Sequence, residues 1–106
     1  MSKNVKIVVF APITDAGKVR RAMGDAGAGV VGNYSHCSFS SVGVGRFLPL
    51  KGANPAIGMV GKPEEVQEER IEMVCKREKL ESVVAAIKSA HPYEEVALDV
   101  YPLEEV

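Results

Sequence analysis

The chain has 106 residues, 46% of them hydrophobic and 25% charged, with a formal net charge of -1 at pH 7. This length and composition predict one domain, residues 1–106, around a single hydrophobic core. Lys and Arg are scattered among Asp and Glu, which argues against nucleic acid or a membrane surface as a partner. No apolar run approaches the roughly 20 residues that cross a bilayer, and the N-terminus lacks a signal-peptide pattern. We therefore expect a cytoplasmic protein, with Cys37 and Cys75 as two buried free thiols.

The chain is predicted to begin with a strand and a helix. Residues 5–11 are β-branched and aromatic, which predicts a strand that is apolar on both faces. Apolar residues then recur at helical spacing between a possible cap at Thr14 or Asp15 and a stop at Gly27. This pattern predicts an amphipathic helix.

A second strand is predicted at residues 33–42, which alternate weakly, contain no Pro and are rich in hydroxyl side chains. We expect Cys37 and Phe39 to face the core from this strand. Tyr34 and His36 would then point to the opposite face of the sheet.

The rest of the chain repeats the pattern after a long connection. Residues 43–64 are rich in Gly and Pro, and a connection of this length in a compact domain tends to be functional. Residues 70–76 alternate cleanly and predict a third strand. The spacing of residues 80–87 predicts a helix that must end before Pro92, and residues 96–101 predict a fourth strand.

The order strand, helix, strand, strand, helix, strand predicts an α+β, ferredoxin-like sandwich. In this fold both helices cover one face of a four-stranded antiparallel sheet. The topology brings three segments to the same end of the molecule: the loop at residues 43–61, Pro12 and residues 91–95. We expect them to be neighbours.

Two helices cover only one side of such a sheet. Large apolar residues on the other side would forfeit roughly 1.5 to 3 kcal/mol each if they stayed in water. The residues expected there are Val8, Phe10, Val74 and Tyr101. The open face is therefore expected to be an oligomer interface, unless the long loop folds over it.

Residues 27–32 spell the pattern G-x-G-x-x-G. A dinucleotide-binding fingerprint leaves a strand and opens a helix, whereas this run follows a predicted helix and precedes a predicted strand. We therefore interpret these glycines as residues that end a helix and turn the chain.

The run His-Pro-Tyr-Glu-Glu at residues 91–95 places an imidazole and two carboxylates at a helix-to-strand turn. His91 and Glu94 are candidate ligands for a divalent metal ion, or a candidate base and its orienting group. The alternative is a structural turn, in which His91 bonds the end of its helix and Glu94 caps loop amides. His36 is a further candidate metal ligand, or a residue of an interface or pocket.

Three segments carry a family resemblance. They read Gly-Ala-Gly-x-x-Gly-Asn-Tyr-Ser-x-Cys-Ser-Phe at 27–39, Gly-x-Gly-Arg-Phe-x-Pro-Leu-x-Gly-Ala-Asn-Pro-x-Ile-Gly at 43–58, and His-Pro-Tyr-Glu-Glu-x-Ala at 91–97. Together they resemble the domain inserted in the middle of Nif-three-like (Nif3-like) dinuclear-metal proteins, also called GTP cyclohydrolase I type 2 homologues. That domain also occurs alone, as we expect here, and it resembles the CutA and PII signalling proteins in fold.

The resemblance also bounds the expected function. In the full-length relatives the flanking halves supply the metal ligands, so that chemistry transfers to no residue of this chain. PII-like relatives form trimers and bind small ligands near their inter-subunit clefts and long loops. CutA-like relatives are linked to divalent metal tolerance, and only the motif at residues 91–94 supports that link here.

The sequence thus predicts a non-enzymatic homo-oligomer, a trimer or dimer, that binds a small anion, a metabolite or a divalent metal ion. The candidate ligand-binding residues are Arg46, Asn54, His91, Tyr93 and Glu94. Arg46 would supply positive charge. The alternatives are a small metal-dependent hydrolase, with His91 as base and Glu94 as orienting group, and a protein-docking domain.

Overall fold

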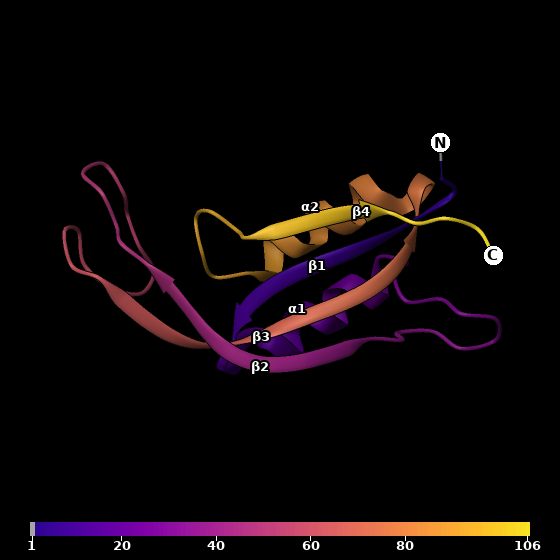
Figure 1. Ribbon diagram of the computed structural model, residues 1–106, viewed down its shortest axis with the longest axis horizontal. Coiled ribbons are helices and arrows are strands. Elements are labelled where there is room, and N and C mark those ends of the chain that lie inside the picture. The colour runs from indigo at the N-terminus through magenta and orange to yellow at the C-terminus, as the bar shows by residue number, and fades with distance from the viewer. Residues whose placement is uncertain (1) are drawn as a thin grey trace.

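The computed structural model describes residues 2–106, and its elements follow the predicted order (Figure 1). They are β1 (Asn4–Pro12), α1 (Ile13–Asp25), β2 (Phe39–Phe47), β3 (Glu64–Lys76), the 3-10 helix η1 (Arg77–Lys79), α2 (Leu80–Ala90) and β4 (Leu98–Pro102). The strands form one antiparallel sheet in the order β2-β3-β1-β4, and both helices lie behind it in Figure 1. The predicted ferredoxin-like fold is confirmed.

The hydrophobic core lies between the sheet and the two helices. Every second residue of β1 faces it, because side chains alternate along a strand. The fully buried residues of this layer include Val5, Ile7, Val9, Met23, Val83 and Ile87. Each large aliphatic side chain buried here stabilises the fold by roughly 1.5 to 3 kcal/mol. No helix within residues 2–106 is long and apolar enough to span a membrane.

The opposite face of the sheet is uncovered by helices, as predicted. The four apolar residues expected there face that side by register: Val8, Phe10, Val74 and Tyr101. Val8 is nevertheless 0% exposed. Charged side chains pack beside it: Arg70 Nε donates to Glu72 Oε2 over 3.2 Å, and Lys6 Nζ lies 3.8 Å from Glu72 Oε1. Arg70 also stacks over the Phe10 ring at 5.6 Å. The chain itself therefore covers part of this face.

α1 begins directly after β1, so the predicted caps Thr14 and Asp15 lie inside its first turn, where neither caps the helix. The C-terminal end of α1 is as predicted. Gly27 adopts a φ of 114° and donates its N–H to the Gly24 carbonyl over 3.1 Å, and the next N–H bonds the Met23 carbonyl over 3.0 Å. This paired hydrogen bonding is the Schellman ending, which favours glycine at the left-handed position. The glycine run therefore terminates a helix.

The second strand begins at Phe39, so its predicted bounds of 33–42 are wrong. The preceding polar run is a loop instead. Val31 and Tyr34 exchange backbone hydrogen bonds of 2.9 and 3.0 Å, which closes a tight turn. Asn and Ser residues favour such turns because their side chains compete for backbone groups.

The predicted facing of this segment is also wrong. Phe39 is 68% exposed on the open face, because its register partner Glu72 lies on that face. Cys37 is half-buried at the end of the loop, whereas Cys75 is buried as predicted, and both are free thiols.

β2 and β3 continue beyond β1 as a two-stranded arm, residues 44–67 (Figure 1, left). β3 starts at Glu64 rather than at residue 70, and Gly43 and Gly45 lie inside β2. The irregular part of the predicted 43–64 connection therefore shrinks to residues 48–63. The arm points away from the sheet and makes the molecule elongated, with extents of 46 × 25 × 22 Å. Its radius of gyration, 14.6 Å, exceeds the about 13 Å expected for a compact chain of this length.

Candidate ligand site at the base of the arm

The arm meets the turn between α2 and β4, residues 91–97, which we call the corner (Figure 1). Glu94 Oε2 accepts a 2.7 Å hydrogen bond from the backbone N–H of Asn54. Tyr93 packs edge-on against Phe47, with ring centroids 5.9 Å apart. The predicted proximity of the long connection and the histidine run is therefore confirmed.

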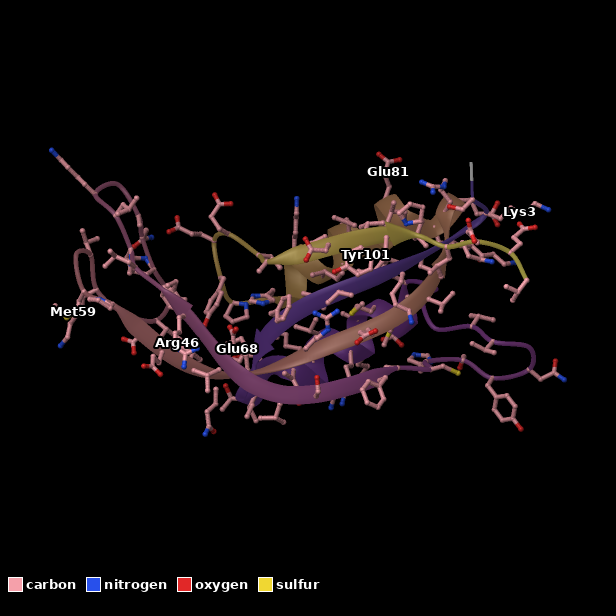
Figure 2. All side chains as sticks on the ribbon, viewed as in Figure 1. Lys3, Arg46, Met59, Glu68, Glu81 and Tyr101 are labelled. Atoms are coloured by element: carbon pink, nitrogen blue, oxygen red, sulfur yellow. The ribbon has the colours of Figure 1, made fainter. Side chains whose placement is uncertain are left out.

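These contacts border a hollow of about 440 Å³ between the arm and the corner. Its wall is mainly apolar and includes Phe10, Phe47, Leu48, Pro49, Leu50 and Ile57. The charged residues in its lining are Arg46, Glu68, Glu94 and Glu95. Figure 2 shows Arg46 and Glu68 at the base of the arm. The hollow thus combines an apolar wall with a few charged groups, as ligand sites commonly do.

His91 is a structural residue in this arrangement. It is 6% exposed, and its Nε2 lies 2.7 Å from the Phe10 carbonyl, which can only accept a hydrogen bond. Its Nδ1 lies 3.1 Å from the backbone N–H of Tyr93, which can only donate. The proton must therefore be on Nε2, and no lone pair is left for a metal ion or a substrate proton.

The predicted metal pair of His91 and Glu94 does not fit this geometry. The Glu94 carboxylate caps the Asn54 amide and belongs to the arm contact. In residues 2–106, no group of three or more His, Cys, Asp or Glu side chains is placed to hold a metal ion. The same geometry gives no support to a hydrolase with His91 as its base. It matches the predicted alternative, a structural turn with Glu94 capping a loop amide.

His36 lies outside the site, and its predicted place on the open sheet face is wrong. Its loop is at the end of the molecule opposite the arm (Figure 1). There His36 Nε2 lies 2.9 Å from Asp25 Oδ1, and its Nδ1 lies 3.0 Å from Ser35 Oγ. The ring packs on Gly24, where a Cβ would approach Cδ2 to 2.0 Å. His36 therefore braces this loop against the end of α1.

The other candidate residues divide into two groups. Arg46, Tyr93 and Glu94 line the hollow, whereas Asn54 contributes the backbone N–H that ties the arm to the corner. The Arg46 side chain is 68% exposed and its guanidinium lies 3.7 Å from Glu65 Oε2. Its charge is therefore shared with a neighbouring carboxylate.

Glu68 is a charged lining residue that the sequence analysis missed. Its carboxylate lies across Gly45, where an added Cβ would come within 1.9 Å of Oε1. Burial raises the pKa of the Glu68 carboxyl group. The glycine in the middle of β2 could have signalled a close side chain on the next strand.

Tyr93 also lines the hollow, beside Glu68. Its hydroxyl is buried and makes no hydrogen bond of normal geometry within residues 2–106, although the Glu68 carboxylate lies close enough to act on it. Burial, assisted by the Glu68 carboxylate, raises the pKa of Tyr93 to about 12. The phenol therefore stays protonated at neutral pH, with its O–H buried beside the Glu68 carboxylate.

The fold places the chain among small ferredoxin-like proteins. The periplasmic divalent cation tolerance protein CutA from Archaeoglobus fulgidus matches with a TM-score of 0.70 and 18% identity, over 97% of this chain and 86% of that one. GlnK from B. subtilis matches with a TM-score of 0.62 and 14% identity, over 94% and 84%. At these identities the likeness concerns the fold alone.

Sequence comparison finds higher similarity to Nif3-like proteins. The GTP cyclohydrolase 1 type 2 homolog of Bacillus subtilis (strain 168) is 50% identical over 100 residues, 94% of this chain and 27% of that protein. The solved Bacillus cereus protein related to NIF3 matches with a TM-score of 0.85 and 50% identity, over 98% of this chain and 26% of that one. No protein-family model matches the chain. The chain is therefore similar to Nif3-like proteins over nearly its whole length and spans about a quarter of the length of these relatives.

Proposed function

We propose that this chain is a non-enzymatic binding module that holds a small molecule in the hollow between arm and corner. The observation that carries the proposal is the hollow itself. Its volume of about 440 Å³ falls in the usual range of small-molecule sites, and its wall is mainly apolar. Its two sides are joined by the Glu94 to Asn54 hydrogen bond and the Tyr93 to Phe47 contact. A ligand touching both sides would restrain the arm, a change that a partner could detect.

A thermal-shift screen tests this proposal. The screen would include anionic, neutral and cationic metabolites, and divalent metal ions with EDTA reversal as a separate arm. Ala97→Phe places a ring into the lining of the hollow, and Ala85→Phe is the matched control on the exposed side of α2. We expect at least one ligand to raise the melting temperature of the wild type and of A85F, but not of A97F. A ligand shift that is equal in all three proteins would refute this location.

We further propose that the module works as a homo-oligomer in the cytoplasm. β2 supports this, because its outer edge pairs with no strand within residues 2–106 and both of its faces are largely exposed. Phe39, Val42 and Val44 are 68%, 69% and 46% exposed on it. An exposed apolar edge strand invites pairing with another chain. Light scattering should give a multimeric mass for the wild type and a smaller mass for Val42→Lys; a monomeric wild type contradicts the proposal.

The names of the similar proteins suggest other activities, a cyclohydrolase reaction and divalent cation tolerance. Both belong to those proteins. Because His91 has no free ring nitrogen, the geometry here favours binding over hydrolysis. A divalent ion that raised the melting temperature, with the shift lost in Glu94→Gln, would bring the metal role back.

A further inference from the structure

Glu68 and Glu69 are adjacent acids with opposite surroundings. Glu69 faces the helices and forms an ion pair with Arg20. Glu68 faces the hollow, is half-buried and forms no ion pair with any residue from 2 to 106. Burial of an unpaired carboxylate is unfavourable, so partly buried acids usually have a cationic partner. Glu68 therefore lacks a cationic partner, such as the one that Arg20 provides for Glu69.

The charges in the lining are predominantly negative. Glu68, Glu94 and Glu95 contribute three carboxylates, against the single guanidinium of Arg46. That guanidinium lies beside the exposed Glu65 carboxylate. The hollow would therefore repel an anion, and Coulomb attraction would favour a cation, the more so because the apolar wall reduces solvent screening.

The charged side chain of Glu68 and the apolar wall belong to the same lining. Glu68 lines the hollow together with Phe10, Phe47 and Leu48, which supply apolar surface. A ligand with an apolar body and one charged head could satisfy both parts at once. The aromatic rings would also favour a cationic head over an anionic one.

We propose that the hollow takes a small organic cation, whose ammonium group meets the Glu68 carboxylate while its apolar body packs against Phe10 and Phe47. This inference rests on the proposed function, because it names the ligand class of the same site. It replaces the small anion that the sequence suggested.

Three probes of matched size test the inference: 2-phenylethylammonium, 2-phenylethanol and 3-phenylpropionate, titrated by calorimetry at neutral pH and low salt. We expect the cation to bind about tenfold more tightly than the alcohol, and the anion to bind least, because a charged hydrogen bond contributes more than a neutral one. If the alcohol or the anion binds as well as the cation, the inference is wrong and the proposed function stands. If none of the three binds, the inference also fails, and the broader metabolite screen decides the proposed function.

Two pairs of variants locate the charge. Glu68→Gln should lower the affinity for the cation about tenfold and leave the affinity for the alcohol unchanged, whereas Glu81→Gln on α2 should change neither. Gly45→Ala should have the effect of E68Q by displacing the Glu68 carboxylate, since its Cβ would lie 1.9 Å from Oε1. Gly43→Ala is its control, because nothing lies within 4 Å of a Cβ there. Equal cation affinity in E68Q, G45A and the wild type overturns the inference.

Discussion

The two ends of the molecule are each organised around a histidine, but the two histidines are used in opposite ways. At the arm end His91 is 6% exposed, and backbone groups occupy both of its ring nitrogens. At the other end the His36 side chain is 45% exposed and pairs with Asp25 through a side-chain contact. The difference shows that a histidine in a conspicuous motif can have a structural role beside a site, with both ring nitrogens used by the backbone. The group near His91 that is left without an ion pair within residues 2–106 is the Glu68 carboxylate.

Replacing each histidine by alanine should produce the largest contrast. His91→Ala removes a buried ring and two hydrogen bonds and leaves the Phe10 carbonyl without this donor, so we expect a loss of about 3 kcal/mol in the free energy of unfolding. His36→Ala removes an exposed pair and should cost no more than about 1 kcal/mol. Urea unfolding measures both. Equal losses would mean that the two ends are built alike.

The tyrosines at the two ends provide a second contrast, with the opposite sign. Tyr93→Phe removes a buried hydroxyl that makes no hydrogen bond of normal geometry, so the variant should be about 1 kcal/mol more stable than the wild type. The contact with Phe47 needs only the ring and should survive. Tyr34→Phe, at a position 75% exposed, should leave stability unchanged. A Tyr93→Phe protein less stable than the wild type would show that the hydroxyl is satisfied after all.

Hydrogen exchange at a single backbone amide should report the link between the arm and the corner. Glu94→Ala removes the acceptor of the Asn54 N–H, so hydrogen exchange at that amide should accelerate, at a cost in stability of about 0.5 kcal/mol. Glu95→Ala is the matched control, since the acceptor of the Asn54 N–H is the Glu94 carboxylate and not that of Glu95. If hydrogen exchange at the Asn54 amide were as slow in E94A as in the wild type, this hydrogen bond would not be what holds the arm to the corner.

Sequence patterns predicted the body of the fold well because they reflect one buried face. The alternation in β1 and the spacing in α2 follow directly from the core that both elements share. β2 was misplaced because both of its faces are largely exposed, so it has little hydrophobic alternation to detect. Its glycines suggested a loop, although Gly45 serves to admit the Glu68 side chain.

The sequence predicted where the candidate site lies, but not which role each of its residues has. Topology alone placed the arm beside the corner, and Tyr93 and Glu94 line the hollow there. The use of both His91 nitrogens depends on the Phe10 carbonyl, a contact across 81 residues that no local motif encodes. Glu68 lies in a run of acids that resembles a solvated segment until the register of β3 sets its face.

The smallest expected effect is a pH dependence that separates Glu68 from the exposed acids. Burial raises the pKa of Glu68 above its ordinary 4.5, with His91 and Tyr93 offsetting part of the shift, so the ionised form costs more in the folded than in the unfolded chain. This penalty is absent at low pH, where the group is protonated in both states, and complete above the raised pKa. Glu68→Gln lacks the penalty.

The melting temperature of E68Q should therefore exceed that of the wild type near neutral pH, and the difference should shrink as the pH falls to about 4. Exposed Glu81→Gln should show no such trend, since its carboxylate lies in solvent in both states. An advantage of E68Q that grew on acidification would mean that Glu68 is paired with a cation in the folded chain. The charge that we assign to the ligand would then come from the protein itself.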